Sequence, residues 1–279
     1  MQFETKNNPV AIESVRERAL DIVANSTARI APIDLEKRLS AEYRLKKRQI
    51  KSIIRNLVAD GELVYTYEFG RTFLERSFAG PVRISEHIVL LSPGRRFSAN
   101  PDDVAVKIKP GASFGAGNHP STRLAIRGIE FALLSNQSGH NKSNAGVLDI
   151  GTGSGVLLIT AVLCGMKSGL GIDIDACARV EAAENVKIND LTDRIAISGQ
   201  SVEHIRQRFS VILANLRYPS LKKMLFQLNE MASADCFLIF SGIRDSEVDD
   251  LLKVYKQIHF EKIWTESELG WSGVVLRRA

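Results

Sequence analysis

The stretch from Val147 to Gly155, which reads V-L-D-I-G-T-G-S-G, constrains the fold more than any other part of this chain. Three apolar residues around one Asp predict a short buried strand, and three glycines at alternate positions predict a tight turn. The apolar run that begins at Val156 predicts a helix directly after the turn. Glycines are needed where the backbone adopts left-handed angles or where a ligand lies against the main chain. The stretch therefore predicts a strand, a turn and a helix N-terminus that together bind a ligand.

The spacing of the glycines separates two kinds of ligand. A dinucleotide site follows Gly-x-Gly-x-x-Gly, but the third glycine of that pattern falls on Val156 here, so a pyrophosphate is disfavoured. The next predicted strand, 169–174, contains Asp173 near its end, where a carboxylate can accept both hydroxyls of a ribose. This pairing resembles the class I S-adenosylmethionine (SAM) methyltransferases. A Gly-rich turn in an unrelated α/β sheet is the alternative interpretation.

Composition limits the class of protein. With 279 residues, of which 44% are hydrophobic and 25% charged, the chain suits one large or two modest globular domains. Its three scattered cysteines contain no C-x-x-C and suit a reducing cytoplasm, and its five dispersed histidines predict no metal site. The N-terminus lacks the apolar core of a signal peptide, and no apolar run approaches the roughly 20 residues of a membrane span. We therefore expect a cytoplasmic protein that binds no metal and is not inserted in a membrane.

Residues 1–76 predict a small α+β domain. Apolar residues at helical spacing predict three helices before Gly61, and a hairpin is expected around Gly70. Three helices and a hairpin resemble a winged helix. Basic residues gather before and within the third helix, at Arg44, Lys46, Lys47, Arg48, Lys51 and Arg55. Such a helix face can bind nucleic acid through its phosphates, whereas other winged helices dock proteins, so the sequence leaves both partners open.

Residues 77–279 predict the larger, catalytic domain. A Gly-rich loop over 114–122 leads into a helix from Arg123 to Leu134, which Ser121 or Thr122 is expected to cap. Strands and helices then alternate, and the last two strands form an antiparallel hairpin at the edge of the sheet. The expected fold is α/β, with a seven-stranded Rossmann-like sheet whose ligand lies at the carboxyl ends of the strands. Later elements are expected at 219–232 and 245–256 for helices and at 235–241 for a strand.

Five motifs make the resemblance more specific. They are K-I-K-P-G-A-S-F-G-A-G-N-H-P-S-T from Lys107, V-L-D-I-G-T-G-S-G, G-I-D-I-D, L-A-N-L and F-S-G-I. In order and spacing, across about 78–279, the chain resembles the PrmA family, the bacterial methyltransferases of ribosomal protein L-eleven. The resemblance implies SAM as cofactor and an amine of a protein substrate as methyl acceptor. It does not cover residues 1–76, because that family recognises its substrate with a ferredoxin-like domain.

The same resemblance implies which residues contact the cofactor. The loop before the first helix of the domain is expected to close over SAM, and strand ends supply the other contacts. Ala116 and Asn118 stand where the family usually has Thr, so hydroxyl contacts from these positions are lost or replaced. The predicted cofactor-binding residues are Phe114, Gly115, Gly117, Asn118, Thr122, Asp149, Gly151, Gly153, Gly155, Asp173 and Asn215.

Asn215 and Tyr218 are the predicted catalytic residues. Methyl transfer requires a neutral amine placed about 3 Å from the methyl group with water excluded, and a side-chain carbonyl can orient the N–H groups of that amine. Amino-methylating enzymes with Asn-Pro-Pro-Tyr at this place share Asn215 and Tyr218 with the chain, although Leu216 and Arg217 replace the prolines. Tyr218 is therefore expected in the substrate pocket.

Two other functions stay open at the level of sequence. A nucleic-acid amino-methyltransferase would dock through the basic third helix and stack Tyr218 on a flipped base. A non-catalytic DNA-binding regulator would use SAM only as a signal for the winged helix.

Overall fold

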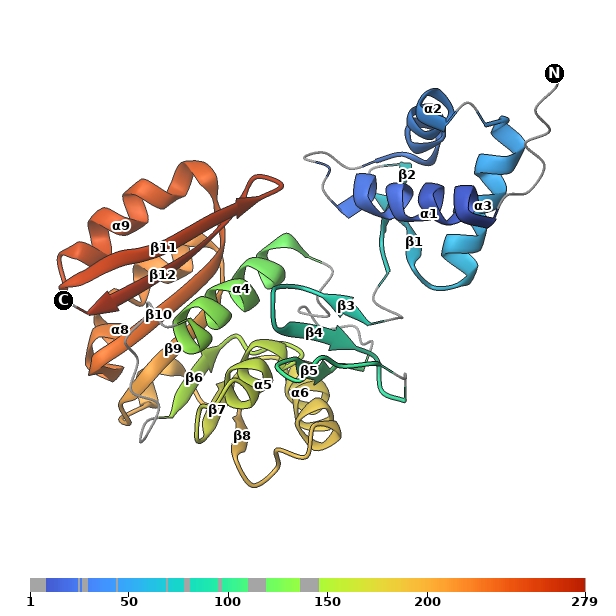
Figure 1. Ribbon diagram of the computed structural model, residues 1–279. Helices are drawn as coiled ribbons and strands as arrows, with labels where there is room; N and C mark the ends of the chain where they lie inside the picture. The colour runs from blue at the N-terminus through green and yellow to red at the C-terminus, as the bar shows by residue number, and fades with distance from the viewer. Residues whose placement is uncertain are drawn as a thin grey trace, which may run out of the picture. The chain divides into compact units, whose positions relative to one another are not determined.

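The computed structural model describes residues 9–278 except 25, 27–29, 44, 69, 78–80, 95–96, 110–118 and 136–145. The chain forms two compact units, Met1–Gly80 and Pro81–Ala279 (Figure 1). The boundary predicted from the sequence, between residues 76 and 77, lies near this division and stays a prediction.

The N-terminal unit consists of three helices and a hairpin. Its elements are α1 (Pro9–Ala24), α2 (Pro32–Tyr43), α3 (Lys47–Ala59), β1 (Leu63–Glu68) and β2 (Arg71–Arg76). The two strands pair antiparallel, and Ile30 adds an isolated bridge to Leu74. The apolar stripes of the helices meet in one core around Leu35, Ile50 and Leu57, which are fully buried. The three helices and the hairpin lie where the sequence predicted them. The classification of this unit as a winged helix stays a prediction.

The larger unit is built on one seven-stranded sheet. In spatial order its strands are β11 (Phe260–Glu268), β12 (Trp271–Arg278), β10 (Ala232–Arg244), β9 (Phe209–Asn215), β6 (Val147–Ile150), β7 (Gly169–Ile172) and β8 (Ile195–Ser198). The strands from β10 to β8 are parallel, and β12 runs antiparallel to both of its neighbours. Parallel strands covered on both faces require continuous apolar runs, which β6 and β9 have. The carboxyl ends of β6, β7 and β9 therefore meet at one edge of the sheet.

Helices cover both faces of this sheet (Figure 1). One face carries α4 (Pro120–Leu134), α5 (Val156–Leu163) and α6 (Ala176–Ile188), and the other carries α7 (Tyr218–Lys223), α8 (Leu225–Met231) and α9 (Val248–Lys256). On β9, Ile212 and Ala214 join the core under α7 to α9, so Leu213, which lies between them, faces the side of α4 and α5. At Gly128, α4 approaches the sheet so closely that a Cβ would lie 3.0 Å from Ile239 Cγ2. Among the described residues, no helix is long and apolar enough to cross a membrane.

A small sheet packs beside the first face. It consists of β3 (Val82–Arg83), β4 (Ile88–Leu91) and β5 (Val104–Lys107), in that order. Two buried side-chain amides, Asn185 of α6 and Asn189 at its C-cap, hold the end of β5. Asn189 Oδ1 accepts from the backbone N–H of Lys107 and Asn185 Oδ1 from that of Lys109, each at 2.9 Å. These bonds fix the segment that leads toward the Gly-rich loop.

Several element boundaries differ from the sequence prediction. The first helix of the larger unit begins at Pro120 and is capped by His119, not by Ser121 or Thr122, because His119 Nδ1 accepts the backbone N–H of Ser121 at 3.2 Å. The helix expected over 219–232 is divided at Met224 into α7 and α8. The strand expected over 235–241 is extended at both ends, and a 3₁₀ turn, Asp245–Glu247, precedes α9.

Candidate active site

The glycine turn after β6 forms the floor of the site. Gly151, Gly153 and Gly155 all have positive φ, of 71°, 54° and 81°, which explains why each is glycine. At Gly151 the approach of the chain adds a second reason, because a Cβ there would lie 2.9 Å from Leu216 Cδ2. Gly155 is the N-cap of α5. The turn therefore presents bare backbone at the end of β6, as the sequence predicted.

Asp173 follows β7 and is held in place by backbone amides. Its Oδ2 accepts from Gly153 N–H at 2.9 Å and its Oδ1 from Asp175 N–H at 3.0 Å. Arg179 fixes the backbone here, since its Nη1 donates to the carbonyls of Asp173 and Ile174, each at 3.0 Å. An ionised carboxylate has about four lone-pair sites, so both oxygens keep acceptor capacity after these bonds. Asp173 is therefore held in place and can accept further hydrogen bonds.

Asp149 lies beneath the glycine turn and is only 1% exposed. Its Oδ2 accepts from Thr152 Oγ1 at 2.7 Å, while its Oδ1 has no hydrogen-bond partner among the described residues. Burial raises the pKa of Asp149 to about 7, against the opposing effect of the hydrogen bond from Thr152. Through its bond to Thr152, this buried carboxyl supports the turn from below.

Asn215 ends β9 and projects into the site. Its Nδ2 donates to Thr122 Oγ1 at 3.4 Å, and Thr122 is fully buried at the start of α4. Gly242 makes room for it, because a Cβ at that position would lie 2.9 Å from Asn215 Oδ1. Within the described part of the chain, Asn215 Oδ1 accepts no hydrogen bond, so it can accept one from a ligand. The structure thus brings Asn215 and Thr122 together.

Tyr218 is not brought into the site. Its hydroxyl donates to Asp250 of α9 and accepts from Lys222 Nζ at 3.0 Å. Its ring packs against the core on the α7 to α9 face. The comparison with Asn-Pro-Pro-Tyr therefore does not carry over to Tyr218, because the turn into α7 directs the side chain toward α9.

One cleft of about 750 Å³ lies at the carboxyl edge of the sheet. A cleft of this size suits a small-molecule ligand. The predicted residues Gly151, Gly153, Asp173 and Asn215 line it. Phe114, Gly115, Gly117 and Asn118 lie outside the described residues, so their contacts stay predictions. The described residues contain no group of three or more His, Cys, Asp or Glu that could hold a metal ion.

Sequence reasoning missed several residues that line the cleft. Ile174 is 92% exposed beside Asp173, which gives the cleft an apolar surface of the kind that packs on a base. Trp271 enters from the start of β12 and meets His119 edge to face, with ring centres 4.8 Å apart. Arg217 was noted only as a replacement for proline. Their positions in the sequence could have indicated Ile174 and Trp271, because Ile174 follows the end of β7 and Trp271 stands at the turn where β12 begins. The remaining lining residues are Ser121, Ile150, Ile172, Asp175, Ala178, Gln200, Ser201, Val202, Leu216, Met224 and Gly242.

The strand order and the cleft together define the fold of the class I SAM-dependent methyltransferases. A glycine turn after β6, an acidic residue after the neighbouring β7 and a switch in strand order between β6 and β9 place the ligand at this edge. The residues fit SAM, because Asp173 offers a fixed acceptor for ribose hydroxyls and Ile174 an apolar surface for a base. The cofactor of this fold is S-adenosylmethionine.

Comparison with known proteins gives the family. Residues 75–279 match the family model described as ribosomal protein L11 methyltransferase (PrmA), and the chain belongs to this family. The ribosomal protein L11 methyltransferase of Geotalea daltonii is 31% identical over 204 residues, which are 72% of this chain and 65% of that protein. That of Geotalea uraniireducens is 28% identical in an alignment of 284 positions that covers 96% of this chain and 89% of that protein.

A solved structure agrees with the family assignment. The crystal structure of a ribosomal protein L11 methylase from Lactobacillus delbrueckii subsp. bulgaricus superposes with a TM-score of 0.63 at 28% identity, covering 71% of this chain and 98% of that one. Several sequence relatives, including the one from Geotalea daltonii, are matched over less than two thirds of their own length.

Proposed function

We propose that this chain is a SAM-dependent methyltransferase that methylates an amine of a protein. The observation that carries the proposal is the cleft itself, where Asp173, the glycine turn and the open carbonyl oxygen of Asn215 meet at one sheet edge. The family match over 75–279 supports the same reaction class. The relatives are named for ribosomal protein L11, which makes a ribosomal protein the first acceptor to test.

We assign cofactor binding to the carboxyl edge of the sheet. Asp173 receives the ribose hydroxyls, because both of its oxygens are fixed and keep acceptor capacity. Asp149 acts from below by supporting the turn through Thr152. The residues of this chain assigned to the cofactor site are Thr122, Asp149, Gly151, Gly153, Gly155, Asp173 and Asn215.

The protein's part in the chemistry is to place a neutral amine. When bound, SAM supplies an electrophilic methyl group on a positively charged sulfonium. Held by Asp173 and the glycine turn, SAM would give this methyl group to the amine and leave as the neutral thioether, and the methylated ammonium would release a proton to solvent. Asn215 Oδ1 accepts a hydrogen bond from an N–H of the amine and so directs the nitrogen lone pair toward the methyl group. Asn215 therefore orients the amine and does not act as an acid or a base.

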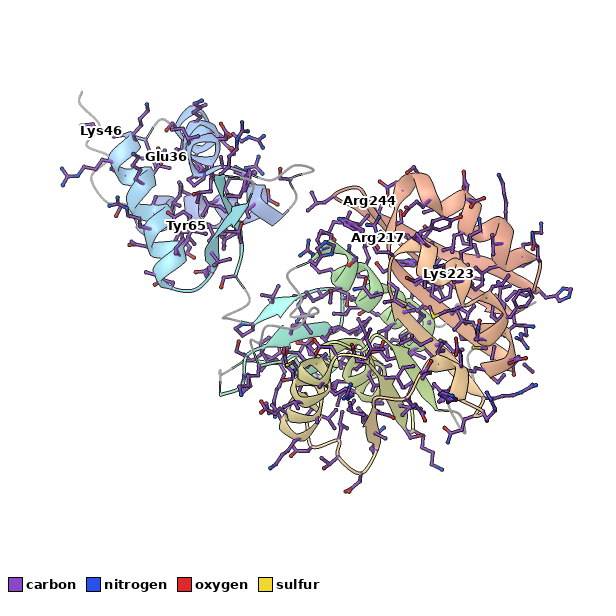
Figure 2. The ribbon with its side chains drawn as sticks, turned by 180° about the vertical axis from the view of Figure 1, so that it is seen from behind. Glu36, Lys46, Tyr65, Arg217, Lys223 and Arg244 are labelled. Carbon is purple, nitrogen blue, oxygen red and sulfur yellow. The ribbon has the colours of Figure 1, made fainter. Side chains whose placement is uncertain are left out.

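The N-terminal unit is assigned to acceptor docking. We interpret it as a winged-helix-like domain, on the basis of three helices, a hairpin and the bridge from Ile30 to Leu74. Lys46, which precedes α3 (Figure 2), is exposed, as are Lys47, Arg48 and Arg55 of α3. Lys51 Nζ lies 4.0 Å from Glu36 Oε2. Exposed cations of this kind also favour a second candidate, docking of nucleic acid through phosphates. The family supports the protein acceptor, since its relatives are named for one.

One assay distinguishes these functions. The intact chain is incubated with methyl-labelled SAM and either ribosomal protein L11 or a cell lysate, and the labelled products are treated with protease or nuclease. We expect label in protease-sensitive product, lost in Asn215→Ala. Label in nuclease-sensitive product would favour the nucleic-acid enzyme, and SAM binding without any transfer would indicate a regulator.

A further inference from the structure

One tryptophan and two arginines form a cluster at the mouth of the cleft. Trp271 and Arg217 line the cleft, and the guanidinium carbons of Arg217 and Arg244 lie 5.1 and 3.7 Å from the centre of the Trp271 ring. Figure 2 shows the two arginines close together. Arg244 and Trp271 are register partners across β10 and β12, so the sheet itself builds the pair. Arg217 comes from the turn after β9, where Asn215 also lies.

The donors of this cluster are largely unused. Glu247 accepts from the backbone N–H of Arg244 at 2.7 Å, and its other oxygen lies 3.8 Å from Arg217 Nη2, beyond hydrogen-bond distance. The neighbouring Asp245 is bonded to Ser272 Oγ at 2.5 Å. Within the described part of the chain, the Arg244 guanidinium has no ion pair and no hydrogen bond. Two guanidinium groups whose N–H donors make no hydrogen bond to any described residue therefore lie beside the cleft in which we propose that the amine is placed.

We propose that Arg217 and Arg244 bind a carboxylate that the methyl acceptor carries one or two residues from the methylated amine. The enzyme then selects amines in acidic peptide segments, an inference that rests on the proposed function. Stacking on an indole holds a guanidinium by its face and leaves its N–H edge free. That edge matches a carboxylate with two parallel hydrogen bonds, a geometry that a lysine does not offer.

The recognition acts at contact distance rather than through a long-range field. Glu247 and Asp245 balance the formal charge of the two arginines, so the cluster as a whole does not attract anions from afar. Short charge-assisted hydrogen bonds are screened little by salt, whereas interactions beyond about 8 Å are screened at physiological ionic strength. The preference for amines in acidic peptide segments should therefore persist when the salt concentration is raised to about 0.15 M.

The test compares acceptors that differ only beside the amine. The full chain is assayed with labelled SAM and pairs of lysine peptides whose flanking residues are Asp and Glu in one and Asn and Gln in the other. We expect kcat/KM in the wild type to be about tenfold higher for the acidic peptide, because one hydrogen bond to a charged group contributes about enough binding free energy for a tenfold effect. The ratio should fall to about one in Arg244→Gln and Arg217→Gln.

Two further variants sharpen the test. Arg244→Glu should reverse the preference, toward a peptide with arginine beside the lysine. Lys223→Gln removes the same charge from an exposed position on α7 that does not line the cleft, so it should keep the wild-type ratio (Figure 2). If peptides are too short to be accepted, the same acidic-to-amide changes are made beside the methylated amine of the protein acceptor.

Each contrary result has a distinct meaning. Equal kcat/KM for both acceptors in the wild type would overturn the inference and leave amine methylation standing. A parallel loss of SAM affinity in Arg244→Gln, measured by calorimetry, would also overturn it, because the arginine would then bind the cofactor. Methylation of no amine in any peptide or protein would overturn the proposed function, and the inference with it.

Discussion

Replacing Asp173 by Asn should weaken SAM binding without unfolding the protein. The change keeps the size of the side chain but removes its charge and turns one acceptor oxygen into a donor group. In the structure both oxygens already accept a backbone N–H, from Gly153 at 2.9 Å and from Asp175 at 3.0 Å. An amide can satisfy only one of these, so its nitrogen faces an N–H that it cannot bind.

The magnitude follows from the bonds lost. A hydrogen bond to a charged acceptor contributes about 1.5–3 kcal/mol, and a ribose would donate two to Asp173. Asn keeps one acceptor, so the loss of binding free energy should be about 3 kcal/mol, which is roughly a 100-fold increase in Kd. The bond lost within the protein should lower the melting temperature without ligand by several degrees, at about 2–4 °C for each kcal/mol.

Calorimetric titration with SAM measures the first effect, and thermal melts without ligand measure the second. Asp175→Asn is the matched control, because it makes the same change two residues away on the same cleft wall. Asp175 caps α6 by accepting from Cys177 N–H at 2.9 Å, and Asn caps a helix equally well. A Kd for Asp173→Asn within threefold of the control would refute the assignment of Asp173 to the ribose.

Three other predictions concern the pH response, the acceptor and the N-terminal unit. Burial raises the folded-state pKa of Asp149 to about 7, above the ordinary value near 3.9, so protonated Asp149 favours the folded state fully below about pH 4, and this one contribution to the stability of the ligand-free protein falls by roughly 4 kcal/mol as the pH rises to 7. Asp149→Asn should flatten that decline, and parallel melting profiles from pH 5 to 8 would contradict it. Asn215→Ala should lower kcat far more than SAM affinity, because the proposed role of its Oδ1 is to orient the acceptor amine; equal losses would make Asn215 only a cofactor contact. Changing Lys46, Lys47, Arg48 and Lys51 together to Gln should leave SAM affinity unchanged and flatten the salt dependence of any duplex binding, since each neutralised phosphate releases counterions; a gel shift that does not respond to salt would exclude phosphate contact by α3.

The glycine turn and the residues at the strand ends could be predicted from the sequence because they depend on local rules. Positive φ at Gly151, Gly153 and Gly155 requires glycine wherever the turn occurs, and parallel strands bring their carboxyl ends to one edge. Asp173 and Asn215 therefore meet at the cleft even though more than a strand and a helix separate them in the chain.

Prediction failed where the direction of a side chain depends on what packs against it. Asn215 and Tyr218 are three residues apart, and a motif comparison placed both in the pocket. Tyr218 instead bonds to Asp250, because the chain turns into α7 at once and α9 lies against it. The cap of α4 was misplaced for a related reason, since an imidazole is an uncommon cap and only the geometry at His119 shows its nitrogen accepting from Ser121.

The sequence by itself determined the class of fold, the glycine turn and the position of Asp173 beside it, because short-range periodicity and backbone angles depend on residues that are neighbours in the chain. Only the tertiary structure decided the cluster of Trp271, Arg217 and Arg244. The three residues lie far apart in the chain, and they meet because β12 inserts between β10 and β11 and so pairs Trp271 with Arg244. No local pattern encodes that pairing, since the register between strands is set by the burial of whole faces against the helices.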